Sequence, residues 1–318
     1  MSSIGDIVLT TPVIRCLKMK YPEAEIHFLV KPAYSELLEP NPHITRLHIL
    51  GDSLRETAAR IRAERYDHIV DIHKNLRTFA LRLMLLRRFH SFPKLNFRKW
   101  IAVKTKRKVL PDIHIVDRYL RAVAFLDVKN DGKGLDFFIP ADLVLPAEIQ
   151  GPLANRDYIV MVVGAKQQTK QIPEEKMLEI VKLMNVPLVL IGGPDDADKA
   201  KRVAAGIDHI PVLHTCGLLN ILQSALLIRG AKLIITGDTG MMHIAAALKK
   251  PVISLWGNTI PAFGMTPYYP MGMEHLSHIL EVSGLSCRPC SKLGYDRCPK
   301  KHFRCMNDIE TAQIRTWL

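Results

Sequence analysis

The stretch ITGDTGMMHIAAALKKPVISLWG, residues 235–257, decides the fold. An apolar run leads into Gly-Asp-Thr-Gly, and a small-residue helix and a second apolar run follow. This strand, turn, helix and strand order is the repeating unit of a parallel α/β sheet. Phosphates bind at the turn between the end of such a strand and the N-terminus of the next helix. An aspartate that only caps the helix gives the same sequence pattern. The turn therefore predicts a diphosphate site that contains Asp238, Thr239, Gly240 and His243.

Similar apolar runs recur along the chain and predict buried parallel strands: EIHFLV, HIVDIH, YIVMVVGA and PLVLIGG. Amphipathic stretches between them, such as PEEKMLEIVKLM and LLNILQSALLIRG, predict helices. The fold class is thus α/β with parallel sheets. A proline-rich segment around residues 140–152 is followed by a second series of predicted strands and helices. We therefore expect two domains, 1–150 and 151–318.

Composition limits the class of protein. The chain has 318 residues, of which 48% are hydrophobic and 24% charged, which excludes a disordered protein. We find neither an apolar run long enough to span a membrane nor a signal peptide, and we expect a cytoplasmic protein. The formal net charge of +13 favours anionic partners.

Much of this charge lies in one segment. Residues 72–111 contain no acid and carry the cations Lys74, Arg77, Arg82, Arg87, Arg88, Lys94, Arg98, Lys99, Lys104, Lys106, Arg107 and Lys108. Nucleic acid is one possible partner, but aromatic residues are sparse and no nucleic-acid motif overlaps the segment. We favour a phosphorylated lipid acceptor at an anionic membrane surface, with Phe92, Phe97 and Trp100 dipping into the interface.

Two further strand ends in the second half carry candidate ligand groups. GAKQQTKQIP, residues 164–173, places Thr169 and Lys170 after a strand, where a lysine can neutralise a diphosphate. LIGGPDDADKA places Gly193 and Asp195 after the next strand. There the glycine can pack against a ligand ring, and the acid can accept a hydrogen bond from an adenine amino group or a ribose hydroxyl. Exposed turn residues and helix caps are the alternative interpretations.

The first half supplies complementary groups. SSIGD offers Asp6 after a glycine turn, and a carboxylate that faces a cleft can act as a general base. DIHKNLRT follows another strand and carries a polar set suited to an acidic substrate: His73, Lys74, Asn75 and Arg77. The alternative interpretation of Asp6 is a helix cap, and that of the second set is the solvated basic start of a helix.

Four of the six cysteines lie near the C-terminus: Cys287, Cys290, Cys298 and Cys305. Their C-x2-C-x7-C-x6-C spacing is compatible with a structural zinc site, with free thiols or with disulfides. No catalytic role is expected of them.

Taken together and in this order, SSIGDIVLTTPVIRCLK, DIHKNLRT, GAKQQTKQIPEEK and GDTGMMHIAAALKKPVISLWG resemble the bacterial heptosyltransferases of glycosyltransferase family 9. The resemblance implies a GT-B fold, in which two Rossmann-like domains face each other across a cleft. It implies inverting transfer of heptose from ADP-heptose to the phosphorylated inner core of lipopolysaccharide at the inner membrane, without a required metal or cofactor. Asp6 then matches the catalytic base, Lys170 a donor-phosphate ligand, and Asp238 to Gly240 with His243 the diphosphate and sugar site.

The chain departs from the family pattern at its start. Relatives carry a strand before Ser-Ser-Ile-Gly-Asp, whereas only Met1 precedes this turn here, which leaves Asp6 with less support. The open alternatives are a transferase that uses another nucleotide sugar, a sugar-nucleotide epimerase, and a degenerate basic binding protein without catalysis. The acceptor hydroxyl and the oligomeric state are not predicted.

Overall fold

The C-terminal half of the computed structural model, which describes residues 3–318, is built on one six-stranded sheet. Its strands are β5 (Ile159–Val162), β6 (Leu188–Ile191), β7 (Val212–His214), β8 (Leu233–Gly237), β9 (Val252–Trp256) and β10 (Ser277–Glu281). Their order is β10-β9-β8-β5-β6-β7, and all neighbours are parallel, which confirms the predicted α/β fold. The strand order reverses between β5 and β8, and such a switch point is where ligands bind.

The central strands are apolar on both faces because helices cover both sides of the sheet. Along β5, Val160 and Val162 enter one core cluster, whereas Ile159 and Met161 enter the other. This alternation follows from the two-residue period of a strand. The helices of this half are α7 (Ala147–Leu153), α8 (Glu174–Val181), α9 (Ala197–Ala205), α10 (Ile221–Gly230), α11 (Gly240–Ala247) and α12 (Arg304–Asn307).

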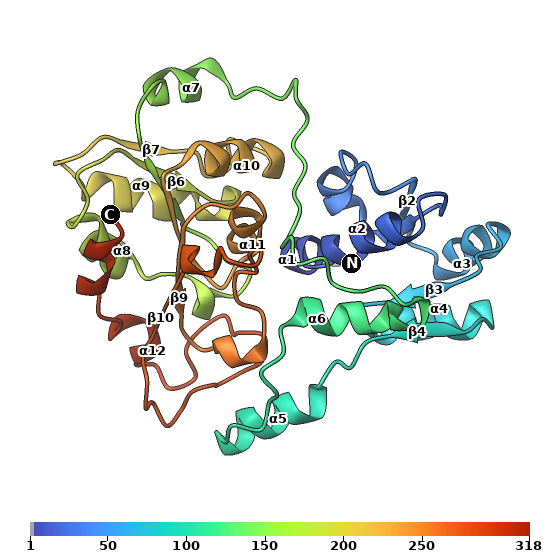
Figure 1. Cartoon of the computed structure of the whole chain (residues 1–318). Coiled ribbons are helices and arrows are strands. Elements are labelled where there is room, and N and C mark those ends of the chain that lie inside the picture. Colours follow the sequence, from blue (N-terminus) through green and yellow to red (C-terminus); the bar gives the residue numbers. More distant parts are fainter. Residues whose placement is uncertain (1–2) are drawn as a thin grey trace.

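The N-terminal half has shorter strands, arranged as two parallel pairs. Strand β1 (His27–Val30) pairs with β2 (Arg46–Ile49), and β3 (Ile69–Asp71) pairs with β4 (Phe89–Ser91). The helices are α1 (Ile4–Val8), α2 (Thr11–Lys20), α3 (Leu54–Ala63), α4 (Leu76–Leu85), α5 (Asn96–Thr105) and α6 (Ile115–Leu120). The two halves lie side by side, and α1 sits where they meet, beside α11 (Figure 1).

The first helical segment of the chain is divided into two helices, α1 and α2. Pro12 has no amide hydrogen, so it cannot donate to the carbonyl of Val8 as a helix would require. The Thr11 hydroxyl donates to that carbonyl instead, at 2.7 Å, and the Thr10 hydroxyl donates to the carbonyl of Ile7 at 2.7 Å. The break sets the short helix α1 apart from α2, with both threonines buried.

A buried arginine ties α2 to the chain that leaves the N-terminal half. Arg15 donates to both carboxylate oxygens of Asp131 at 2.8 Å and to the carbonyl of Gly134 at 2.8 Å, and it also pairs with Asp136. Burial raises the pKa of Asp131, but the hydrogen bonds from Arg15 and from the Lys133 amide outweigh it and leave the pKa below its usual value. The charged pair therefore stabilises the folded chain above acidic pH.

Replacing Asp131 with Asn should lower the free energy of unfolding by about 2–3 kcal/mol, because Arg15 loses a buried charged partner. The lowered pKa means that this contribution is present above the pKa of the unfolded carboxyl and is lost as the pH falls. Denaturant unfolding at pH 7 and pH 3.5 measures both effects. Asp127→Asn is the matched control, since the Asp127–Lys20 pair is exposed and should contribute less than about 1 kcal/mol. Equal losses in the two variants would contradict the assignment.

Candidate functional site

The switch point between β5 and β8 brings two predicted donor residues together. Lys170 follows β5 in a short 3-10 turn, Gln168–Lys170, and Asp238 follows β8 directly. The Lys170 Nζ lies 2.6 Å from the Asp238 Oδ2, and the Thr259 hydroxyl donates to the same oxygen at 2.9 Å. Both charged side chains are largely buried, with 19% and 11% of their surface exposed. The sequence separation of the two residues gives no hint of this contact, which depends on the strand order.

The turn before α11 is shaped as predicted for an anion site. Thr239 caps the helix, with its hydroxyl accepting from the Met242 amide at 3.4 Å and bonded to the Thr236 hydroxyl at 2.9 Å. Gly240 begins the helix, so the first amides of α11 lie beside Asp238. A helix N-terminus of this kind offers backbone N–H groups and a partial positive charge to a phosphate.

Gly237 is required by the close approach of the Lys170 backbone. A Cβ atom at Gly237 would lie 2.1 Å from the Lys170 carbonyl oxygen, a distance that no side chain tolerates. The end of β8 and the turn after β5 are therefore in direct contact. This contact fixes where the Lys170 side chain starts.

Thr169 is buried and its hydroxyl is fully used by the chain. The hydroxyl donates to the carbonyl of Tyr295 at 3.0 Å and accepts from the Tyr295 amide at 2.8 Å. In this arrangement the Thr169 hydroxyl is therefore not free to donate the hydrogen bond to the sugar nucleotide that the sequence predicts. Thr169 instead fastens the loop that contains the clustered cysteines to the turn that carries Lys170.

At the third strand end, Gly193 and Asp195 are both exposed, beside the switch point. Asp196, one residue further on, has the more constrained position. Its Oδ2 accepts from the Gly193 amide at 2.8 Å, and it packs so tightly on Gly164 that a Cβ there would lie 1.8 Å from it. The sequence shows two adjacent acids here, and only the backbone geometry separates the one that closes the turn from the one that faces solvent.

His243 lies at the contact between α11 and α1 rather than at the surface. Its side chain is buried, and a Cβ at Gly5 would lie 2.9 Å from its ring. Burial lowers its pKa to about 3, so the ring is neutral at pH 7, and its Nδ1 has no hydrogen-bond partner among residues 3–318. This position favours a packing role between the two halves over direct contact with a donor.

The same contact carries Asp6 toward the donor turn. Gly240 also lacks room for a side chain, since a Cβ there would lie 2.7 Å from Ile4. Asp6 stands in the first turn of α1, where its Oδ2 accepts from the Ser3 hydroxyl at 2.7 Å. Two glycines thus allow the catalytic-base candidate of one half to approach the phosphate-site candidate of the other.

The predicted acceptor residues form a turn between β3 and α4. The Asp71 carboxylate accepts from the amides of His73 and Lys74 at 2.9 and 2.8 Å, and Asn75 caps α4. Burial lowers the pKa of His73. Beside the turn is a hollow of about 470 Å³, lined by Asp71, Lys74, Asn75, Leu76, Phe79, Arg82, Phe89, Ser91 and Lys94. His73 and Arg77 do not line it.

Two cations between the halves were not singled out from the sequence. Lys99 on α5 lies over the ring of Phe263, with its Nζ 5.3 Å from the ring centre, and burial lowers its pKa to about 8. Arg118 on α6 is buried and donates to the carbonyl of Phe263 at 3.1 Å, while its Nε and Nη1 have no partner among residues 3–318. The negative charges of Asp238 and Asp6 raise the pKa of Lys99 and so partly offset the effect of burial. Lys99 therefore lies near the candidate site. The signal available in the sequence was only the excess of basic residues.

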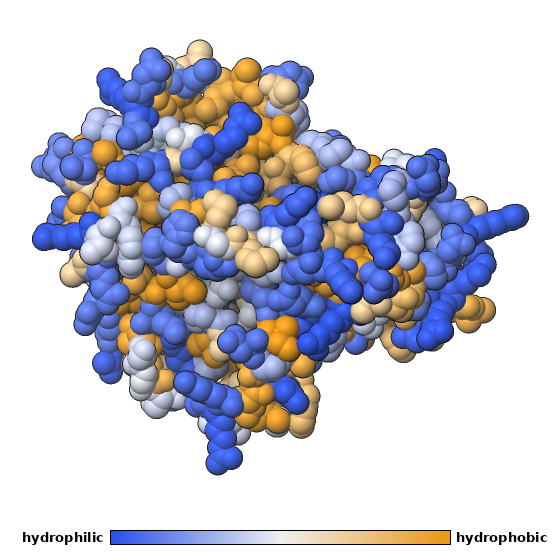
Figure 2. Space-filling view, in the orientation of Figure 1, coloured by the Kyte–Doolittle hydropathy of each residue, from blue (hydrophilic) through white to orange (hydrophobic). Residues whose placement is uncertain are grey.

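Of the three aromatic residues predicted to enter a membrane interface, one is buried and two are exposed. Phe92 is 3% exposed and packs against Tyr119, so the prediction that it enters a membrane interface is wrong. Phe97 and Trp100 on α5 are exposed and stacked, with ring centres 6.1 Å apart. Figure 2 shows hydrophobic surface over the position that α5 occupies in Figure 1.

All six cysteines, which lie within the described residues, are free thiols. Cys287 lies 3.9 Å from the Nε2 of His302, and the Cys290 thiol donates to the Cys287 carbonyl at 3.0 Å. Cys305 is buried, and burial raises its pKa to about 12. Within residues 3–318, no three of the four clustered thiols come within 4.8 Å of one another.

None of the helices among residues 3–318 has both the length and the apolar character needed to cross a bilayer.

Comparisons with known proteins agree with this arrangement. Lipopolysaccharide heptosyltransferase 3 of Escherichia coli is 28% identical over 278 residues, which cover 80% of this chain and 81% of that protein. Lipopolysaccharide heptosyltransferase 1 of Pseudomonas aeruginosa is 25% identical over 339 residues, covering 98% of this chain and 90% of that protein. The solved structure of E. coli heptosyltransferase WaaC with ADP has a TM-score of 0.66 at 20% identity, covering 99% of this chain and 96% of that one.

These likenesses confirm the predicted GT-B fold class. The family model for glycosyltransferase family 9 (heptosyltransferase) matches residues 54–293, a range that includes Lys170 and Asp238 and leaves Asp6 outside. Because the match spans well over half of the sequence, the chain belongs to glycosyltransferase family 9.

Proposed function

We propose that this protein transfers heptose from ADP-heptose to a phosphorylated acceptor of the lipopolysaccharide inner core. The observation that carries the proposal is the Lys170–Asp238 pair at the switch point, with Asp6 brought toward it by the contact of α1 with α11. The named relatives are lipopolysaccharide heptosyltransferases, and one solved structure of this fold contains ADP. We also propose the division into domains 1–150 and 151–318, with the donor on the second and the acceptor on the first.

In the proposed reaction, Asp6 takes the proton from an acceptor hydroxyl as the oxygen attacks the anomeric carbon of the donor. The bond from that carbon to the diphosphate breaks, and ADP leaves with its electron pair from the opposite face, so the configuration inverts. The Ser3 hydroxyl, which donates to the Asp6 carboxylate, orients it for this proton transfer. A positioned base of this kind contributes about 10²–10⁴-fold to the rate.

On the donor side, Lys170 and the first amides of α11 stabilise the negative charge that develops on the departing diphosphate. Lys170 is already paired with Asp238. When the donor binds, Lys170 therefore either leaves Asp238 for the phosphate or contacts both. Asp238 and Thr239 then contact the sugar and the phosphate, while Gly193 and Asp195 lie on the side where the nucleoside extends. No metal or other cofactor is required in this scheme, since lysine and backbone amides supply the positive charge.

For the acceptor we propose the hollow beside α4, together with the basic groups between the halves. Lys74, Arg82 and Lys94 offer cations around the hollow, whereas Leu76 and Phe79 offer apolar surface, a combination suited to a phosphorylated glycolipid. The Nε and Nη1 of Arg118 have no partner among residues 3–318, so an anionic group of the acceptor or donor would compensate its charge.

We further propose a cytoplasmic protein that is peripheral to the inner membrane and does not act on nucleic acid. Three exposed side chains of α4 are apolar, Leu76, Phe79 and Leu83, and so is Leu86 at its C-cap. Phe97 and Trp100 on α5 add to them, and cations flank both helices. Exposed apolar side chains among cations are typical of surfaces that rest on anionic lipid.

The clustered cysteines are proposed as a structural element rather than a catalytic one, with zinc as the candidate ion. Thr169 and Lys106 bind this loop at Tyr295 and Pro289, so an ion there would act by ordering the loop. The thiols as they stand need to move together to share one ion.

The function is tested by transfer from ADP-heptose to purified inner-core acceptor. The native protein should transfer heptose, and Asp6→Asn should lower kcat by at least about 100-fold because the proton acceptor is lost. Binding of ADP-heptose, measured by calorimetry, should be unchanged in this variant. Ser3→Ala keeps the carboxylate but loses the hydrogen bond that orients it, so its kcat should fall less than that of Asp6→Asn. Normal turnover by Asp6→Asn would refute its role as the base.

Replacing Lys170 with Ala should weaken ADP-heptose binding by about 10–100-fold, since a charged hydrogen bond to phosphate contributes about 1.5–3 kcal/mol. Lys166→Ala is the matched control, because Lys166 lies in the same turn and is exposed. Calorimetric titration of the native protein with ADP, ADP-heptose, UDP-glucose and GDP-mannose also measures selectivity. A preference for UDP or GDP ligands would show that the donor is another nucleotide sugar. An unaltered affinity for ADP-heptose in Lys170→Ala would show that Lys170 does not bind the donor.

Membrane contact predicts that Phe97→Ser with Trp100→Ser weakens binding to vesicles that contain phosphatidylglycerol by about tenfold or more. Native binding should fall as salt is raised, because cations contribute. Vesicle sedimentation measures both. Leu218→Ser removes an equally exposed apolar side chain from the other half and should have no effect. Identical vesicle binding by all three proteins would contradict the proposed surface.

A further inference from the structure

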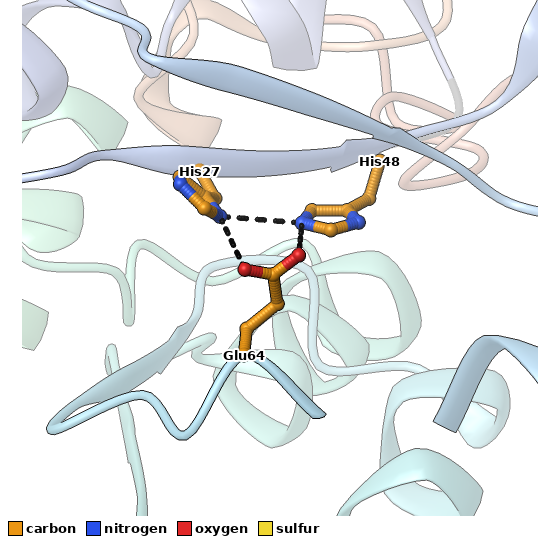
Figure 3. Close-up of side chains that lie close together, drawn as sticks. All are labelled: His27, His48 and Glu64. Atoms are coloured by element: carbon orange, nitrogen blue, oxygen red, sulfur yellow. Dashed lines mark hydrogen bonds and ion pairs between the residues drawn. The ribbon is translucent and has the colours of Figure 1, made fainter. Parts of the chain in front are cut away.

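A cluster of metal-ligating side chains lies away from the transfer site, in the N-terminal half. His27 on β1 and His48 on β2 project from the same side of the parallel strand pair, and Glu64 follows α3 and faces them (Figure 3). Each offers one ligand atom, and these atoms lie within 4.8 Å of one another. Within residues 3–318 this is the one group of three or more such side chains that converges so closely.

The distances in this cluster match the spacing of ligands around one small ion. The His27 Nδ1 and the His48 Nε2 are 3.3 Å apart. Two nitrogens bound tetrahedrally to zinc at about 2.0–2.1 Å stand about 3.3–3.4 Å apart, so this pair needs no movement. The Glu64 Oε2 lies 4.0 Å from the His27 Nδ1, and the Glu64 Oε1 lies 3.8 Å from the His48 Nε2, so the carboxylate needs to move closer to share one ion with both rings.

The surroundings orient the ligands for such an ion. The side chains of His27, His48 and Glu64 are 6%, 12% and 25% exposed, so the cluster is shielded but reachable from solvent. Glu25 lies 3.6 Å from the Nε2 of His27, on the far side of the ring. At this distance the carboxylate makes no hydrogen bond to the ring, but its charge favours the tautomer with the proton on Nε2, in which Nδ1 can bind a metal.

Two side chains compete with an ion for these ligands. The Tyr66 hydroxyl lies 2.6 Å from the His27 Nδ1 and 2.8 Å from the His48 Nε2, so it bridges the two nitrogens. Arg46 lies 2.7 Å from the Oε1 of Glu64. Removing either competitor should favour an ion, whereas a cluster that serves only as a hydrogen-bond network should lose stability in the same variants.

We propose that His27, His48 and Glu64 form a divalent-metal site that takes Zn²⁺ and fastens the β1–β2 pair to the end of α3. Two imidazoles and one carboxylate are a zinc ligand set, with a water molecule in the fourth position. The site is independent of the transfer reaction. It stabilises the half of the protein that carries the proposed acceptor surface.

The test is titration of the full chain with Co²⁺ and Zn²⁺, with Co²⁺ absorption and calorimetry as readouts. Cys287→Ser with Cys290→Ser removes two of the four clustered thiols, and sulfur-to-cobalt charge-transfer absorption reports binding by those that remain. In this background one equivalent should bind without a sulfur band and raise the melting temperature. His27→Ala, His48→Ala and Glu64→Gln should each weaken binding by at least about 10-fold.

Three further variants keep the proposal falsifiable. His68→Ala removes a histidine that contacts His90 elsewhere in the same half, and it should bind as the parent does. Tyr66→Phe and Arg46→Ala should bind Zn²⁺ at least as tightly as the parent, because each removes a competitor. Circular dichroism checks that every variant is folded. Absence of stoichiometric binding, or equal binding after loss of His27 and His48, would overturn the site.

Discussion

The proposed chemistry depends on the contact of two short helices that come from opposite halves of the chain. Gly5 of α1 faces the ring of His243, and Gly240 of α11 faces Ile4, at distances that exclude a Cβ on either glycine. The contact is apolar and buried, and it joins one core cluster that contains residues from both halves. Because Asp6 and Asp238 each stand one or two residues from these glycines, their separation is set by backbone packing and not by flexible side chains.

The local signals in the sequence were enough to find the strands around the site. The runs that form β5, β6, β8 and β9 are continuously apolar and end in glycine or polar residues, which is typical of strands covered on both faces. Short or polar strands gave no such signal. Strand β2 reads RLHI and β7 reads VLH, and each is recognised only through its parallel neighbour.

The sequence indicated where the candidate site residues follow their strands, but not how their side chains are oriented. Asp238 and Lys170 follow adjacent strands, so the strand-end argument found both, but their ion pair required the order of the sheet. The burial of Thr169 and His243 could not be predicted, because it depends on segments far away in the sequence, namely the loop at Tyr295 and the helix α1. Lys99 and Arg118 were not distinguishable among the many cations of the sequence, and only their contacts with Phe263 of the other half single them out.

The paired hydrogen bonds between Thr169 and Tyr295 have a thermodynamic consequence. They join the turn that carries Lys170 to the loop that carries four cysteines, so neither segment can be ordered without the other. Any ligand that steadies Lys170 therefore steadies the cysteine loop, and by reciprocity a loop held by an ion or loosened by oxidation changes the affinity at Lys170 by the same factor. Thr169, through its hydroxyl and its backbone amide, therefore makes the order of the cysteine loop part of the free energy with which an anion binds at Lys170.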